Sequence, residues 1–155
     1  MFPILISAAM LVSCAEQYVV NGSSNVEGLE AKTLYLKVFA GEDMRAIDSS
    51  RVVHGKFRFR GVLDSVTMAN VFVDDTSVMP VVLESGEVSL NIGESTQSAT
   101  GTPMNDSLSQ FIQRKTQIDA QMAELPHLES QMIMDGISLD QISVELDAKA
   151  RALND

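Results

Sequence analysis

Cysteine and histidine are the side chains that most often act as nucleophiles, bases and metal ligands. This sequence of 155 residues has only Cys14, His54 and His127. A single cysteine excludes an internal disulfide, a CxxC redox pair and a cysteine-based structural zinc site. The two histidines are far apart in the sequence, and neither stands in a metal-ligand spacing. A hydrolase or metal enzyme would have to depend on carboxylates and hydroxyls alone. We therefore expect no enzyme, no catalytic residue, no metal and no cofactor.

The chemistry open to Cys14 depends on the segment before it, which is apolar and carries no charge until Glu16. Fourteen residues of helix span roughly 21 Å, short of the ~30 Å hydrocarbon core, so the run is typical of a signal-peptide apolar region. It ends Leu11-Val12-Ser13-Cys14, which resembles the bacterial lipobox, where a small residue precedes the cysteine that is lipidated. The sequence predicts a lipoprotein signal peptide over 1–13, lipid attachment at Cys14 and a lipidated tether over 14–17.

Two other interpretations of this segment stay open. In one, Cys14 is a buried thiol in a hydrophobic strand; in the other, the segment is an ordinary signal peptide that is cleaved elsewhere. The segment departs from the usual export pattern because no Lys or Arg precedes the apolar run. A start assigned too late, with a few basic residues missing, would explain this departure.

The overall charge limits the kinds of partner that the protein can bind. The formal net charge is −10, and no Lys/Arg cluster forms a local exception. Such a chain repels nucleic acid phosphates, so we expect no nucleic acid partner. The same charge argues against binding anionic lipid head groups by electrostatics alone.

Apolar and polar residues alternate over 18–102, with turn residues at regular intervals. This pattern is typical of an antiparallel β-sandwich or barrel. Pro80 marks its strand as an edge strand or places a bulge at the start of that strand. Hydrophobic alternation predicts strands at 33–39, 48–53, 56–61, 67–73, 78–84, 87–92 and 97–100.

Turn residues join these strands. His54-Gly55 is a tight-turn candidate that would pair 48–53 with 56–61 as a hairpin. Asn21-Gly22-Ser23 has the residue types of a turn. Asp74-Asp75 lacks the multi-oxygen spacing of a Ca²⁺ loop and is expected to be a polar turn.

The strand at 56–61 carries Lys56, Arg58 and Arg60 on one side and Phe57 and Phe59 on the other. The basic side is a candidate surface for an acidic ligand. The alternative is the solvated face of an antiparallel strand, which predicts the same alternation and is favoured.

The spacing changes to that of helices over 103–155. Thr102 is a candidate cap and Pro103 a favoured first helical residue. Apolar residues then recur at intervals of three and four residues, and Lys115 is the one polar residue at such a position. Pro126-His127 is expected to interrupt the helix. A short piece over 128–134 is expected to end at Asp135-Gly136, and Ser138 to cap a second helix.

This pattern predicts a C-terminal α-helical hairpin, a helical arm, after the mainly β domain. The second helix reaches the last residue without a terminating signal, which is compatible with a truncated chain. Met122, Met132 and Met134 are candidates for an adaptable protein-binding face. Packing within the protein is the favoured explanation for these methionines.

Several strings in the sequence, taken in order, resemble one family. They are VEGLEAKTLYL at 26–36, DSS at 48–50, HGKFRFRG at 54–61, VVLESG at 81–86 and TGTPMND at 100–106. They resemble the uncharacterised β domain at the N-terminus of Bacteroides-group envelope thiol:disulfide interchange lipoproteins. The resemblance implies a lipobox, then the β domain, then a helical spacer, usually followed by a thioredoxin-like domain with a CxxC pair. Here that domain is absent, and only Cys14 carries over, as the lipid-attachment position.

The function that follows is a non-enzymatic, lipid-anchored module of the bacterial cell envelope, periplasmic or surface-facing, held to the membrane through its N-terminal lipid. The helical arm is its candidate protein-binding surface. The alternative is the N-terminal accessory portion of a thiol–disulfide oxidoreductase whose catalytic domain this chain lacks.

Overall fold

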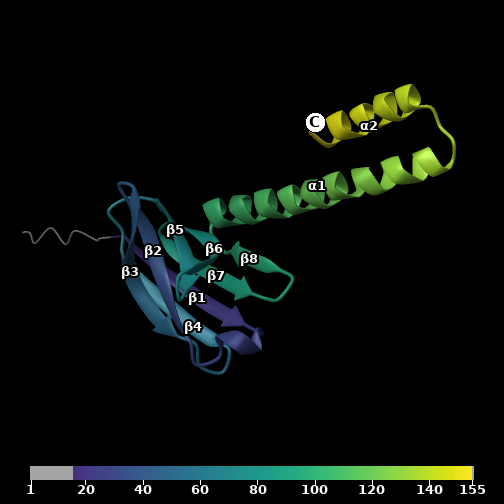
Figure 1. Ribbon diagram of the computed structural model, residues 1–155. Coiled ribbons are helices and arrows are strands. Elements are labelled where there is room, and N and C mark those ends of the chain that lie inside the picture. The colour runs from purple at the N-terminus through teal and green to yellow at the C-terminus, as the bar shows by residue number, and fades with distance from the viewer. Residues whose placement is uncertain (1–15, 155) are drawn as a thin grey trace, which may run out of the picture. The chain divides into compact units, whose positions relative to one another are not determined.

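The computed structural model describes residues 16–154. Eight strands form two four-stranded sheets, followed by two helices (Figure 1). The strands of one sheet lie in the order β4-β1-β7-β8 and those of the other in the order β3-β2-β5-β6. The strands are β1 (Gln17–Ser24), β2 (Thr33–Ala40), β3 (Asp43–Arg51), β4 (Lys56–Val62), β5 (Thr67–Val73), β6 (Thr76–Leu83), β7 (Gly86–Ile92) and β8 (Gln97–Thr100). This confirms the mainly β sandwich followed by a helical pair.

Six of the seven expected strands are present. β5 and β8 have the expected bounds, and β2, β4, β6 and β7 differ from them by one or two residues. The strand expected at 48–53 overlaps only the end of β3, which begins five residues earlier. Pro80 lies on β6, which is an edge strand, and the β5–β6 register shifts by one residue near Pro80. Both features anticipated from Pro80 are thus confirmed. Asp74 and Asp75 form the expected turn between β5 and β6.

The turn predicted at Asn21-Gly22-Ser23 is wrong, because these residues lie in the middle of β1. β1 is a central strand, antiparallel to β4 and parallel to β7. Gly22 pairs with Phe57, and a Cβ on Gly22 would lie only 2.1 Å from the Phe57 ring. Glycine is required here for close packing across the strands, not for a turn.

The hairpin predicted around His54-Gly55 is also wrong, although the tight turn itself is present. His54 and Gly55 have φ values of 51° and 67°, and a single bridge joins Val53 to Lys56. Beyond that bridge the two strands separate, since β3 pairs with β2 and β4 pairs with β1. The turn therefore carries the chain from one sheet to the other.

The core lies between the two sheets and is built from the inward-facing residues of the strands. Phe57 and Phe59 on β4 make an edge-to-face contact with ring centroids 5.7 Å apart. The largest fully buried apolar side chains are Phe59, Leu34, Leu36, Leu83, Leu90, Ile92, Val20, Val52, Val71, Val81 and Val88. Burial of these alternating residues confirms the sidedness expected of the strands.

The helical arm contains α1 (Pro103–Met134) and α2 (Leu139–Asn154). The interruption predicted at Pro126-His127 is wrong, because α1 continues through Pro126. Proline removes one helical hydrogen bond, but the residues around it, 120–125 and 128–131, are mostly good helix formers that carry the helix across.

The ends of the two helices match the sequence signals. Ile137 N donates to Met132 O and Gly136 N to Ile133 O, both at 3.1 Å, with Gly136 at φ 77°. This is a Schellman motif. Gln141 N donates to Ser138 Oγ at 3.4 Å, and that hydroxyl donates to Gln141 Oε1 at 3.1 Å, so Ser138 caps the start of α2 as predicted.

The chain divides after Asn105 into two compact units, so the first turn of α1 belongs to the β unit. Neither helix in the described part of the chain has the length and apolar character needed to cross a membrane.

Candidate functional site

The residues singled out by type do not form one site in the described part of the chain. Cys14 lies outside the described residues. His54 is exposed in the turn before β4, and His127 is exposed on α1, in the other unit. Among residues 16–154, no three His, Cys, Asp or Glu side chains gather as metal ligands.

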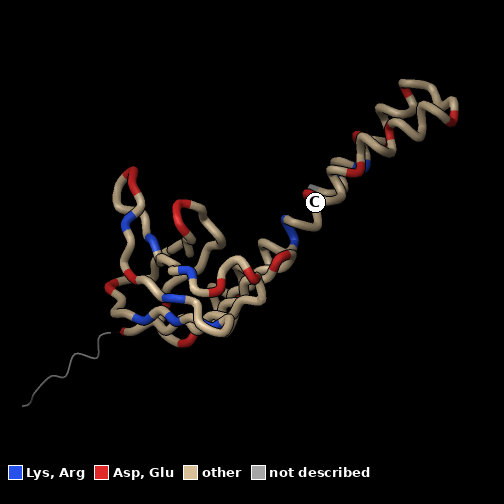
Figure 2. Tube along the Cα trace, turned by 60° about the horizontal axis from the view of Figure 1, so that its bottom comes forward, with Lys and Arg blue, Asp and Glu red and all other residues tan. Residues whose placement is uncertain are grey.

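The basic stripe is the outer face of β4. Lys56, Arg58 and Arg60 are exposed and alternate with buried Phe57 and Phe59. Charges of both signs are spread over the chain rather than gathered in one block (Figure 2). The solvated-face interpretation of the stripe fits this arrangement.

The backbone of the same strand meets the other sheet. Arg58 N donates to Ser50 Oγ and Arg60 N to Asp48 Oδ2, both at 3.0 Å. β4 is the edge strand of its sheet, and these bonds satisfy edge amides that would otherwise be open to pairing. Side chains of β3 thus close this corner of the sandwich.

A polar hollow of about 310 Å³ lies on the outer face of the β4-β1-β7-β8 sheet. It is lined mainly by hydroxyls and amides, with Lys56 at one side and no carboxylate. Its polar side chains are Asn21, Ser23, Ser89, Asn91, Ser98 and Thr100. These groups can donate and accept hydrogen bonds.

A second hollow, of about 370 Å³, lies at the end of the β unit where β1 begins. Tyr18 and Asp48 line it together with Arg45, Arg60 and several apolar side chains. Burial, and then the negative charge of Asp48, raise the pKa of the Tyr18 hydroxyl above its ordinary value of 10.0. Tyr18 therefore stays protonated at neutral pH and cannot serve as a base there.

The start of α1 is fixed to β6 by a buried polar cluster that the sequence reasoning did not single out. Val82 N donates to Asn105 Oδ1 at 2.9 Å, and Asn105 Nδ2 donates to Val82 O at 2.8 Å and to Thr102 Oγ1 at 2.8 Å. Glu84 Oε1 accepts from Met104 N at 2.8 Å. The helix N-terminus is thus satisfied by side chains, and Thr102 takes part as expected but through Asn105.

A second cluster holds the loop before β2 against the turn before β4. The Glu30 carboxylate accepts from His54 N and Gly55 N, each at 2.9 Å. The hydrogen bond from Gly55, and then that from His54, lower the pKa of Glu30 below its ordinary value. The cluster is exposed and holds the turn in place.

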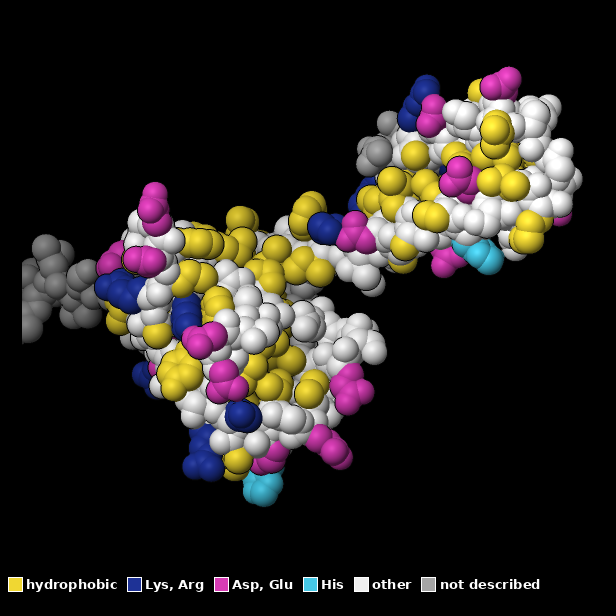
Figure 3. Space-filling model, in the orientation of Figure 1, with side chains coloured by type: hydrophobic (Ala, Val, Ile, Leu, Met, Phe, Trp, Pro, Cys, Tyr) yellow, Lys and Arg dark blue, Asp and Glu magenta, His cyan; other side chains and the backbone are white. Residues whose placement is uncertain are grey.

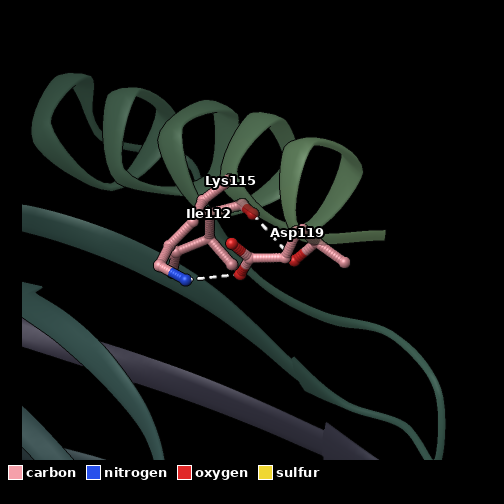
Figure 4. Close-up of polar contacts among 4 residues, drawn as sticks. Ile112, Lys115 and Asp119 are labelled. Carbon is pink, nitrogen blue, oxygen red and sulfur yellow. Dashed lines mark hydrogen bonds and ion pairs between the residues drawn. The ribbon is translucent and has the colours of Figure 1, made fainter. Parts of the chain in front are cut away.

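The arm presents an exposed surface with a few ordered polar contacts. Lys115, the polar residue within the apolar spacing, pairs with Asp119 one turn later, and Thr116 Oγ1 donates to Ile112 O at 2.9 Å (Figure 4). The three methionines do not form one face, because Met132 is buried whereas Met134 is 78% exposed. The alternative in which these three methionines share one binding face is therefore wrong, and Met132 is packed as the favoured explanation expects.

The structure defines a β-sandwich domain, held together by hydrogen-bonded clusters, that is followed by a helical arm. A family match covers residues 18–108, more than half of the chain. The chain belongs to this family, the domain of unknown function DUF4369. The match includes all but the first two described residues of the β unit, and it includes the Asn105–Val82 pairing.

Comparisons with curated proteins and with solved structures add little to the family match. None of the curated proteins matches the chain. Among solved structures, the chain is similar to the solution structure of the CBM25-1 of beta/alpha-amylase from Paenibacillus polymyxa, at 11% identity and a TM-score of 0.37. That match covers 58% of this chain and 96% of the other. We draw nothing about ligands from a likeness at this level.

Proposed function

We propose that this chain is a non-enzymatic module of the bacterial cell envelope, anchored to a membrane by lipid on Cys14. The observation that carries the proposal is the string Leu11-Val12-Ser13-Cys14 at the end of an uncharged apolar run. A thiol at that position is the nucleophile that forms the diacylglyceryl thioether. Several acyl chains give stable anchoring, whereas one chain is marginal.

The position of the first strand supports this proposal. β1 begins at Gln17, the last residue of the expected tether and only three residues after Cys14. Every described strand begins after Cys14. Cleavage before Cys14 would then remove no part of the described fold.

The non-enzymatic part of the proposal rests on the residue inventory. One cysteine, two distant histidines and scattered carboxylates do not supply a paired nucleophile and base. The module would act by holding a partner, or the rest of a larger protein, near the membrane. The mature chain should neither reduce nor oxidise a test disulfide, and turnover in an insulin-reduction assay would contradict this.

The anchoring is tested by Cys14→Ala in the cell that makes the protein. The variant should lose its acyl groups and leave the membrane fraction. Ser13→Ala is the matched control, since it keeps a small residue before the cysteine and should stay in the membrane. Unchanged membrane association of Cys14→Ala would refute the proposal.

A second candidate is the N-terminal accessory portion of a thiol–disulfide oxidoreductase. It is favoured by the order of the strings at 26–36, 54–61 and 100–106, which resembles the β domain of Bacteroides-group interchange lipoproteins. The coding sequence after Asp155 separates the two candidates. An in-frame thioredoxin-like domain would support the second candidate, and a stop codon the first.

A further inference from the structure

We infer that the end of the β unit where β1 begins rests directly on the lipid bilayer, with four exposed apolar side chains in the interface. This inference rests on the proposed lipid attachment at Cys14. It adds which surface faces the membrane and which residues contact it.

The length of the tether limits the distance between the acylated Cys14 and the first residue of β1. Cys14 and Gln17 are separated by three residue steps, and a fully extended chain advances at most about 3.6 Å per residue, so the tether spans about 11 Å at most. An acylated Cys14 sits at the boundary between head groups and acyl chains. The first residue of β1 is therefore held within roughly one head-group layer of that boundary.

The end of the sandwich near Gln17 carries an apolar rim, which we define as Phe39, Val62, Val66 and Met68. Their side chains are 65%, 61%, 57% and 44% exposed. Single exposed apolar residues are ordinary, but several gathered at one place mark an interaction surface. Figure 3 shows hydrophobic side chains gathered on this face of the β unit, over the ends of β2 and β5.

Strand pairing places the rim residues at one end of the β unit, Val62 on the β4-β1-β7-β8 sheet and Phe39 and Met68 on the other sheet. Val62 pairs with Gln17, so it lies beside the tether itself. Val38 pairs with Ala69, which places Phe39 next to Met68 on the outer face of the β3-β2-β5-β6 sheet. Val66 immediately precedes β5, in the loop that follows Val62. All four residues thus lie at the tethered end.

The opposite end of the β unit is more polar than the tethered end. It carries the turns at 54–55 and 74–75 and the exposed charged residues Lys32, Arg51 and Lys56. Among the described residues toward that end, Val53 and Tyr35 are the exposed large apolar side chains, at 52% and 38%. The eight residues of β1 at about 3.3 Å each place the two ends about 26 Å apart.

The charges near the rim indicate the kind of lipid surface. Glu42 and Asp64 lie in the turns at this end and Asp43 begins β3, while Arg45 and Arg60 line the adjacent hollow together with Asp48. Carboxylates outnumber the basic groups, so attraction to anionic head groups does not drive the contact. We infer apolar contact with a zwitterionic interface, made effective by the high local concentration that a short tether imposes.

The test uses the single cysteine and the absence of tryptophan from the sequence. The mature chain, beginning at Cys14, is coupled through that thiol to a maleimide phospholipid in phosphatidylcholine vesicles. One tryptophan is introduced per variant: Phe39→Trp and Val66→Trp in the rim, and Val53→Trp at the far end as the control. Circular dichroism verifies that each variant folds.

Interfacial segments bury their apolar face roughly 5–10 Å deep, so brominated phosphatidylcholine should reduce the fluorescence of both rim tryptophans at least about twofold. Val53→Trp should be unaffected. Equal quenching at all three positions, or quenching at Val53→Trp alone, would overturn the inference. Because the lipid is attached chemically, this result is separate from whether cells acylate Cys14, which tests the proposed function.

Discussion

The side chain of Asn105 pairs with the backbone of Val82 as a neighbouring strand would, accepting from its N–H at 2.9 Å and donating to its C=O at 2.8 Å. β6 is an edge strand, and its outward backbone groups at Val82 are buried under the start of α1. Asn105 therefore joins the helix to the sheet and closes part of an edge.

Asn105→Ala should lower the free energy of unfolding of the β unit by about 1–3 kcal/mol, because it leaves buried backbone groups of Val82 unsatisfied. Asn21→Ala, an exposed asparagine on β1, is the control and should change the free energy by about 0.5 kcal/mol or less. Urea unfolding measures both. Equal effects would contradict the role assigned to Asn105.

Gly22→Ala should destabilise the protein by about 1–3 kcal/mol or more, because the new Cβ would meet the Phe57 ring. Gly28→Ala is the matched control, since nothing lies within 4 Å of its added Cβ. A double-mutant cycle with Phe57→Leu should recover part of the loss at Gly22. If the two changes are simply additive, the steric explanation fails.

The hydrogen bonds to Glu30 predict a pH dependence. The folded state holds the pKa of Glu30 below its ordinary value of 4.5, so these bonds stabilise the fold above that value and lose their effect as the pH falls through the lowered pKa. The difference in unfolding free energy between the wild type and Glu30→Gln should be larger at pH 7 than at pH 3. Glu27→Gln removes a charge from the same loop and serves as the control. A difference that grows toward acid pH would contradict the account.

α1 is continuous through Pro126. Pro126→Ala should therefore leave the helical circular dichroism signal almost unchanged while stabilising the arm by up to about 3 kcal/mol, since proline inside a helix costs that much. If the helix were interrupted at Pro126, the substitution would instead add helical signal. Ala120→Gly, in the same helix, is a comparison that should lower its stability by about 1 kcal/mol.

Much of the fold follows from local patterns. Alternation identified β2, β5, β7 and β8, because each has one face on the core. Gly136 and Ser138 gave the end of α1 and the start of α2, since those signals act within a single turn.

Three of the failures came from partners distant in sequence, whereas α1 is carried through Pro126 by the helix formers on either side of it. Asn21-Gly22 has turn chemistry, but the glycine serves Phe57 on another strand. His54-Gly55 makes the same tight turn whether its strands stay paired or enter different sheets, and that choice depends on β1 lying between β4 and β7. The role of Asn105 likewise depends on β6, so sequence spacing alone did not reveal it.

The central claim is that Cys14 becomes an acylated N-terminus. The most direct test is intact-mass and peptide mass spectrometry of the protein isolated from membranes of the native cell. The account predicts a mature chain that starts at Cys14 and carries a diacylglyceryl group. A chain that retains residues 1–13, or one that starts elsewhere with an unmodified cysteine, would contradict it.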